Sequence, residues 1–144
     1  QPANPWLYEL KGQVLFEKGR PKEAIEPYRK AVSLAPDAGI VRVYLGIALT
    51  ETNDDRYLDE AIRELSAGLR ADEDVPIGYR YLAQGYARKG DTAMAELAAA
   101  QQYFAEGDFK GAKDLARRAR AKLKKGSPGW LRADDIVSYN PPKL

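Results

Sequence analysis

Apolar residues recur along most of the chain at the three- and four-residue spacing of helices, and short polar breaks separate the runs. The breaks contain residues that begin or end helices, such as the N-cap Asn4 followed by Pro5, and Gly90 followed by Asp91. Pro27 lies within one run, where we expect a kink of the helix and not a break. The pattern predicts helices over residues 5–18, 21–36, 38–52, 57–71, 76–89, 91–106 and 108–124.

A longer period overlies this pattern. Gly12 and Gly46 lie about 34 residues apart, and each is followed by a leucine, Leu15 or Leu49, and then by an alanine-centred helix. A third copy of the pattern begins at Tyr79. The spacing and the residue types resemble the tetratricopeptide repeat (TPR), a helix-turn-helix unit that stacks into a solenoid.

The period halves in the second part of the chain, because Gly90 and Gly107 are only about 17 residues apart, half of the TPR length. One helix must therefore serve two successive repeats. The alanine-rich stretch 93–100 suits this role, because small side chains let neighbouring helices approach from both sides and alanine favours helix formation.

Residues 126–139 differ from the repeats and predict a terminal helix. An array of repeats exposes an apolar face at its end, and we expect Trp130, Leu131, Ile136 and Val137 to cover it by packing on the last repeat helix. The predicted fold is therefore an all-α TPR-type solenoid of about seven repeat helices with a C-terminal capping helix. Its single domain spans 1–144, with repeats at 5–38, 39–75 and 76–92, the last sharing a helix with 93–125, a cap at 126–139 and a tail at 140–144.

Composition narrows the possible functions. The 144 residues are 44% hydrophobic and 31% charged, as in ordinary globular domains, and no apolar run reaches the roughly 18 residues of a membrane span. The chain has no His and no Cys, which excludes an imidazole base, a His-based metal site, a disulfide and thiol chemistry. The acidic pairs at 54–55, 59–60 and 134–135 are interpreted as helix caps and first-turn charges. We expect a chain that is not itself an enzyme and holds no cofactor.

The net charge of +2 is small, but basic residues concentrate between Lys110 and Lys125, where Asp114 is the one acidic residue. Two interpretations remain open. The run is either the solvated outer face of the last repeat helix, with cations near the negative end of its dipole, or a surface for nucleic acid or an acidic partner. The run lacks the aromatic residues that stack on bases, which disfavours nucleic acid.

The TPR resemblance implies where a partner binds. In such arrays the first helix of each repeat lines a concave groove through repeat positions 2, 5, 9, 12 and 13, and the groove holds a protein or peptide. Transferred to this chain, these positions are Trp6, Glu9, Gln13, Phe16, Glu17, Ile40, Val43, Ile47, Thr50, Glu51, Ile77, Arg80, Gln84, Arg88, Met94, Leu97, Gln101 and Phe104.

Some of these positions have a second interpretation. Val43, Ile47, Ile77 and Leu97 are also suited to packing between helices, whereas the polar series Arg80, Gln84 and Arg88 suits a peptide backbone or a carboxylate. The family's carboxylate clamp of Lys and Asn is not reproduced, so recognition of a chaperone's C-terminal peptide is not expected. The predicted contact residues are Glu9, Gln13, Phe16, Thr50, Arg80, Gln84, Arg88 and Gln101.

A more specific resemblance covers most of the chain. The segment Tyr79–Ala95, the sequence AQQYFAEGDF at 100–109 and the sequence GSPGWLRADDI at 126–136 resemble the C-terminal TPR domain of BepA-like bacterial zinc metallopeptidases. The segments Tyr8–Gln13 and Glu23–Pro27 resemble the start of that domain. The chain begins with Gln and has no basic-then-apolar leader, so we expect other sequence to precede it.

This resemblance implies a periplasmic parent enzyme with an HExxH protease domain that holds zinc and acts in the quality control of outer-membrane proteins. The present chain would capture substrate or partner proteins and could also pack on the protease domain. Two alternatives remain: a free-standing TPR scaffold, and an RNA-binding helical repeat that uses the basic run, with affinity that falls steeply as salt rises.

Overall fold

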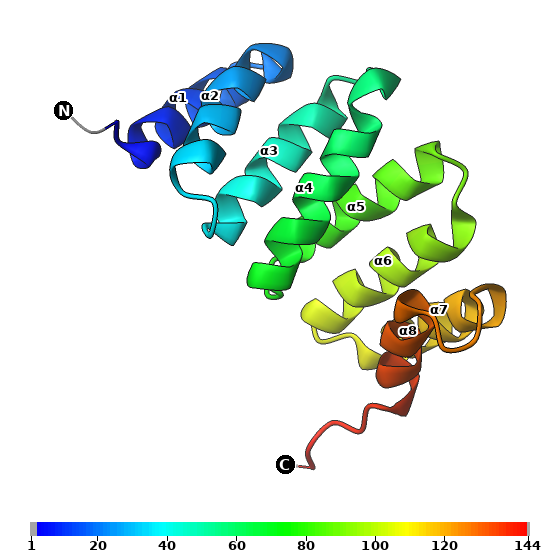
Figure 1. The fold of residues 1–144 in the computed structure, drawn as a ribbon. Coiled ribbons are helices and arrows are strands. Elements are labelled where there is room, and N and C mark those ends of the chain that lie inside the picture. Colours follow the sequence, from blue (N-terminus) through cyan, green and yellow to red (C-terminus); the bar gives the residue numbers. More distant parts are fainter. Residues whose placement is uncertain (1–2, 144) are drawn as a thin grey trace. The chain divides into compact units, whose positions relative to one another are not determined.

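The computed structural model describes residues 3–143, and every regular element in that range is helical. The prediction of an all-α chain with seven helices followed by a terminal one is confirmed, and the ends of the helices lie within about two residues of the predicted ones. The helices are α1 (Pro5–Glu17), α2 (Pro21–Leu34), α3 (Gly39–Glu51), α4 (Leu58–Ala71), α5 (Pro76–Arg88), α6 (Thr92–Ala105), α7 (Phe109–Lys122) and α8 (Pro128–Ser138), with a short 3-10 turn, η1 (Asp55–Tyr57), before α4 (Figure 1).

Local signals determine where the helices begin. The side chain of Asn4 accepts a hydrogen bond of 2.9 Å from the backbone N–H of Trp6, and Pro5 occupies the first turn of α1. Asp54 caps η1 in the same way, because its carboxylate accepts a 3.0 Å bond from the N–H of Arg56. The helix α2 continues through Pro27, as expected.

The chain forms two compact units: unit 1 extends to Glu73, and unit 2 begins at Asp74. Unit 1 consists of the hairpins α1–α2 and α3–α4, and α2 packs on α3. The repeat glycines lie where the second helix of the hairpin packs closely on the first. A Cβ atom at Gly12 would lie 2.7 Å from the Tyr28 ring, and one at Gly46 would lie 2.4 Å from Cγ of Leu65, so only glycine fits.

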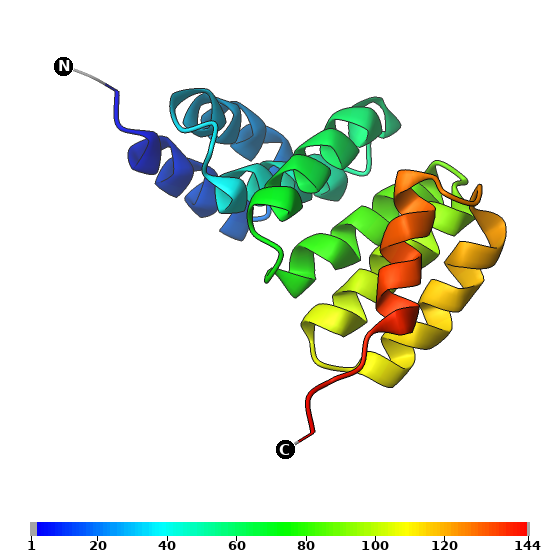
Figure 2. The same ribbon diagram turned by 60° about the horizontal axis from the view of Figure 1, so that its bottom comes forward.

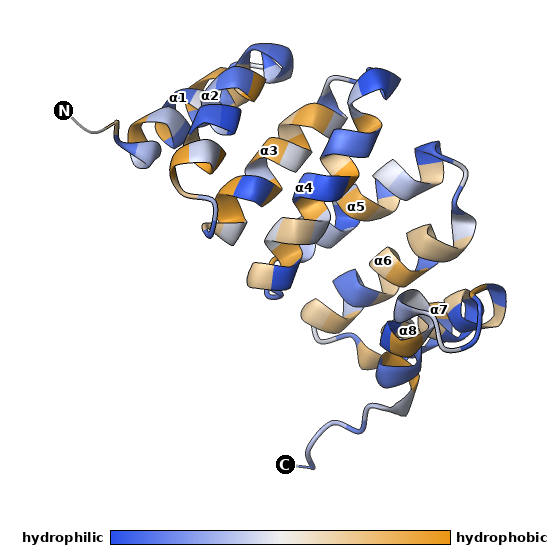
Figure 3. Ribbon diagram, in the orientation of Figure 1, coloured by the Kyte–Doolittle hydropathy of each residue, from blue (hydrophilic) through white to orange (hydrophobic). Residues whose placement is uncertain are grey.

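Large side chains fill the interior of unit 1. Leu45, Leu49 and Leu65 are fully buried, and the rings of Tyr28 and Tyr44 pack with their centroids 6.2 Å apart. Figure 3 shows apolar residues along much of α3, the helix that packs on both α2 and α4. The hydrophobic effect of these side chains is the main stabilising contribution in this unit.

Unit 2 is built around α6, which packs against α5, α7 and α8. Figure 2 shows α8 beside α7 at the end of this unit. The same type of turn precedes and follows α6. Gly90 and Gly107 have φ of 80° and 85°, and the next residue in each case is an aspartate that caps a helix. Asp91 accepts a bond of 3.1 Å from the N–H of Met94, and Asp108 one of 2.9 Å from the N–H of Gly111. The halved sequence period therefore corresponds to one helix between two identical turns.

The capping helix packs on the last repeat helix through Ile136 and Val137, as predicted, but not through Leu131. Ala133 and Ile136 are buried against α6 and α7, and Val137 packs partly on the same cluster. Leu131 was expected in this contact, but 50% of it is exposed, because it lies on the opposite side of α8 from Ala133 at about 100° per residue. Trp130 is half-buried.

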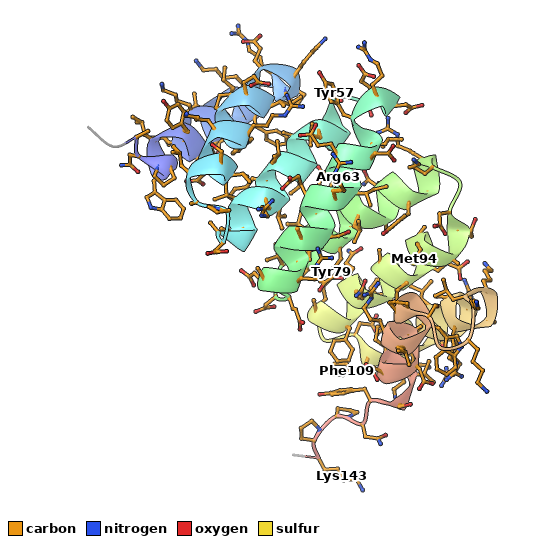
Figure 4. The ribbon with its side chains drawn as sticks, viewed as in Figure 1. Tyr57, Arg63, Tyr79, Met94, Phe109 and Lys143 are labelled. Carbon is orange, nitrogen blue, oxygen red and sulfur yellow. The ribbon has the colours of Figure 1, made fainter. Side chains whose placement is uncertain are left out.

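Two further contacts hold the ends of unit 2. A Cβ atom at Gly129 would lie 3.2 Å from Sδ of Met94, so α8 lies close to the start of α6. Near the other end of α6, the ring of Phe104 packs edge to face against Phe109 and Tyr139, with centroids 5.2 and 4.8 Å away. Met94 and Phe109 are labelled in Figure 4. Phe104, assigned to the groove from the sequence, is therefore used in this aromatic cluster.

In the described residues, no helix has the length and apolar composition that crossing a membrane requires.

Candidate functional site

Unit 2 contains a groove with a volume of about 440 Å³. Its walls come from α5 and α6, and α7 contributes one side chain. We call it the unit 2 groove, and its lining residues are Arg80, Ala83, Gln84, Ala87, Thr92, Ala95, Glu96, Ala99 and Leu115.

Alanine is the reason that the groove exists. Four of its lining residues are alanines, two on α5 and two on α6, and their side chains end at Cβ. The helices α5 and α6 form an antiparallel hairpin around Gly90, so these short side chains lie on facing helices. The space that larger side chains would fill remains open, and its floor is apolar.

Two polar side chains of α5 border the groove. Arg80 and Gln84 are exposed and lie one helical turn apart. The guanidinium carbon of Arg80 lies 5.4 Å from the ring centroid of Tyr81, which is a cation–π contact. Among the described residues Arg80 forms no ion pair, so its planar fork of donors remains available to a carboxylate or a backbone carbonyl.

On α6, Thr92 and the acidic Glu96 also line the groove. Oε1 of Glu96 accepts a short hydrogen bond from Nζ of Lys122 on α7, which joins the two helices. Its Oε2 is buried and has no hydrogen-bond partner among the described groups. A buried oxygen without a partner costs about 1–3 kcal/mol, so Glu96 is an exception to the usual satisfaction of buried polar groups.

The predicted contact residues divide between the two units. Arg80 and Gln84 line the unit 2 groove, whereas Arg88 on α5 and Gln101 on α6 belong to the same unit but do not line it. Glu9, Gln13, Phe16 and Thr50 belong to unit 1.

In unit 1 the predicted residues differ in their exposure. Thr50 is 3% exposed, and its hydroxyl donates a 2.8 Å hydrogen bond to the carbonyl of Gly46. The prediction that Thr50 contacts a partner is therefore wrong, because its side chain is buried. Phe16 packs partly against the core cluster, and the amide of Gln13 donates to Glu17 at 3.1 Å. Glu9 is half-buried. Burial, with a smaller effect of Glu9, raises the pKa of the Tyr28 hydroxyl well above its usual value.

The apolar residues that the TPR resemblance assigned to a groove differ in burial. Val43, Ile47 and Leu97 are buried, which agrees with packing between helices, whereas Ile77 is exposed. Thr92, Glu96 and the four alanines of the groove were not singled out from the sequence as lining residues. The one available signal was the isolated acid at position 96 in a run of alanines, and its environment depends on Lys122 in another helix.

The basic run has partners in neighbouring elements. Arg117 pairs with Asp114 at 3.0 Å within α7, Arg120 pairs with Asp134 of α8 at 2.7 Å, and Lys122 pairs with Glu96. Part of the positive charge therefore joins α7 to α6 and α8, which supports the interpretation of this run as the outer face of a repeat helix.

Within residues 3–143, no group of three or more His, Cys, Asp or Glu side chains is arranged to hold a metal ion.

Comparisons with known proteins agree on the type of repeat. Residues 7–38 match the family model described as tetratricopeptide repeat. The solved structure of TTC0263, a thermophilic TPR protein in Thermus thermophilus, superposes with a TM-score of 0.52 at 16% identity, and covers 95% of this chain and 83% of that one. This likeness shows the fold, which is a TPR-type helical repeat, as the sequence pattern predicted. Such repeats generally bind other proteins and are typically non-catalytic.

Among curated proteins, the chain is similar to the antiviral innate immune response effector IFIT1. It is 36% identical to the protein from Macaca fascicularis and 33% identical to the one from Homo sapiens, in each case over 92 residues and 61% of this chain. The chain spans only 18% of the length of these two relatives.

Proposed function

We propose that this chain is a non-catalytic protein-interaction module that binds a segment of a partner protein in the unit 2 groove. The observation that carries the proposal is that the groove combines an alanine floor with two exposed polar side chains, Arg80 and Gln84, that can form further hydrogen bonds. Apolar parts of a segment would lie on the floor, and Arg80 and Gln84 would bond its carboxylates and backbone.

In its finer form, the proposal is that the module captures substrate or partner proteins for a zinc metallopeptidase in the bacterial periplasm, as part of outer-membrane protein quality control. This step is supported by the resemblance of Tyr79–Ala95 and residues 126–136 to BepA-like proteins, and by that resemblance alone. It predicts that the complete reading frame also encodes an HExxH domain. A complete reading frame without one would favour a free-standing scaffold.

The test measures binding by fluorescence anisotropy. A fluorescently labelled outer-membrane barrel protein is unfolded in urea and diluted into a solution of the present 144-residue chain. The double substitution Arg80→Ala and Gln84→Ala should weaken binding about tenfold, because it removes a charge-assisted bond and an amide contact. Arg118→Ala is the matched control, since it removes an exposed cation of α7 that does not line the groove. Equal losses for both would indicate non-specific charge attraction, and no loss would contradict the groove assignment.

A further inference from the structure

Four large apolar side chains are exposed on α1, which packs on α2 in the first hairpin of unit 1. Leu7, Leu10 and Val14 follow the three- and four-residue spacing that places side chains on one side of a helix, and Trp6 extends the row at its N-terminal end. We call these four residues the α1 patch. Adjacent exposed apolar side chains mark an interaction site, whereas a single exposed leucine needs no explanation.

The 34-residue repeat relates the α1 patch to a buried face of α3. The shift that places Gly12 on Gly46 also places Leu7, Leu10 and Val14 on Val41, Tyr44 and Ala48. Gly12 and Gly46 each face the second helix of their own hairpin, whereas these residues lie on the opposite side of the helix at about 100° per residue. The α1 patch is thus the equivalent of the α3 face that lies away from α4.

On α3 this face is covered by α2. Val41 and Ala48 are buried in the core cluster, and the ring of Tyr44 packs against that of Tyr28 on α2, with centroids 6.2 Å apart. The large side chains that α2 contributes to the cluster are Ile25, Tyr28 and Val32, at positions i, i+3 and i+7. An antiparallel helix with apolar residues at this spacing is therefore what covers such a face in this protein.

We propose that the α1 patch binds the α1 patch of a second copy of this chain. Leu7, Leu10 and Val14 have the spacing i, i+3 and i+7, which is the spacing of the α2 residues that cover α3. The patch is therefore self-complementary, because it is a face that accepts a helix and it carries the residues that such a helix uses. In a two-fold antiparallel pair, Leu10 lies close to the axis and Leu7 of one copy contacts Val14 of the other. This inference concerns unit 1 and is independent of the function proposed for the unit 2 groove.

The dimer should be weak. Four side chains per copy are fewer than the roughly 20–30 residues per side of a standard interface, so we expect a dissociation constant on the order of 10–100 µM. Lys11 borders the patch, and its ammonium group lies 5.2 Å from the ring centroid of Tyr8. The two Lys11 side chains of a pair would approach each other near the axis, so the dimer should be stronger at higher salt, unlike an association driven by opposite charges.

Sedimentation velocity tests the proposal with the present 144-residue chain. The sedimentation coefficient should rise towards that of a dimer as the concentration increases from about 5 µM to about 1 mM. Leu10→Glu should keep the chain monomeric over this range, because two carboxylates would be buried side by side. Leu131→Glu is the matched control: Leu131 is 50% exposed and Leu10 is 52% exposed, but Leu131 lies on α8, so its substitution should leave the dimer unchanged. Circular dichroism checks that both variants keep their helices.

Cross-linking tests the antiparallel arrangement. The chain has no cysteine, so an introduced thiol can form a disulfide only with the thiol of another copy. Under mild oxidation, Leu10→Cys should form a linked dimer about tenfold faster than Leu131→Cys, because only the first places two thiols within bonding distance. In a mixture of Leu7→Cys and Val14→Cys, the mixed dimer should form faster than either homodimer. Mass spectrometry distinguishes the three products.

The outcomes decide between this face and others. A chain that stays monomeric at about 1 mM overturns the proposal. A dimer that Leu10→Glu leaves intact also overturns it, because that dimer would use another face. Faster linking of either homodimer than of the mixed dimer would contradict the antiparallel pairing. None of these results bears on the unit 2 groove, which the anisotropy measurement with Arg80→Ala and Gln84→Ala tests separately.

Discussion

The two units use the same helical hairpin but differ in the size of the side chains in their buried clusters. In unit 1, leucine, valine and tyrosine side chains fill the space between helices, and glycine occurs at the closest approaches. In unit 2, the buried cluster of α6, α7 and α8 is mainly alanine, with Leu97 and Ile136 as its larger members, and the larger buried side chains Tyr79, Tyr81 and Leu82 lie on α5. Charge pairs join helices in both: Arg29 makes a bidentate contact with Glu60 in unit 1, at 2.6 and 2.9 Å, and Arg120 bonds Asp134 in unit 2.

The difference shows that side-chain size determines how much of a helix surface is used for packing against neighbouring helices. A helix with large residues on one face is committed to the neighbours that bury that face. The helix α6 carries small residues around its circumference, so it contacts α5, α7 and α8 and still contributes two alanines to an open groove. The stability of unit 1 should therefore fall most when a buried side chain is truncated, and that of unit 2 when a buried side chain is enlarged.

The largest effect is expected for Leu65→Ala in unit 1. This leucine is fully buried and lies against Gly46, so its truncation leaves a cavity and should lower the free energy of unfolding by about 2–5 kcal/mol. Urea unfolding followed by circular dichroism measures the loss. Leu131→Ala in unit 2 is the matched control, because this leucine is half exposed and should change stability by less than about 1 kcal/mol. Similar losses of stability for the two variants would contradict the proposed difference between the units.

A smaller effect is expected for Ala116→Leu in unit 2. Ala116 is fully buried among alanines, and the added atoms have no space, so the free energy of unfolding should fall by about 1–3 kcal/mol. Ala121→Leu, in the same helix but exposed, should have little effect. Hydrogen exchange should increase in peptides from α6, α7 and α8. If exchange and stability are unchanged, unit 2 is not closely packed.

The smallest effect concerns the turn before α4. Arg56 bonds the carboxylate of Asp54 through its side chain and its backbone N–H, which lowers the pKa of Asp54 from 3.8 to about 2. A lowered pKa favours the folded state above about pH 4, and that contribution is lost as the pH falls towards 2. Carboxyl NMR of Arg56→Ala should show a pKa nearer 3.8. Because the pair is exposed to solvent, stability at neutral pH should not change measurably, and a large loss would mean that this turn stabilises unit 1.

Local residues explain why the helices could be predicted. Asn4, the prolines at helix starts and the Gly-Asp turns act through the backbone of adjacent residues, so their effect can be read from the sequence. The halved period was visible in the same signals. The candidate site was less predictable: Arg80 and Gln84 were assigned from the groove positions that the TPR resemblance implies, but Thr50 is buried and Leu131 lies on the exposed face of α8. Both errors concern which face of a helix meets a neighbour.

The amino-acid sequence alone thus specified the helices, their order and the half repeat, because caps, turns and helical periodicity depend on residues close together in the chain. Packing between the helices settled which small side chains border an open groove and which acid lies in its wall. Glu96 and Lys122 are far apart in sequence and meet only when α6 and α7 pack. The environment of a charged group depends on the helices around it, and that information is absent from its own segment of the chain.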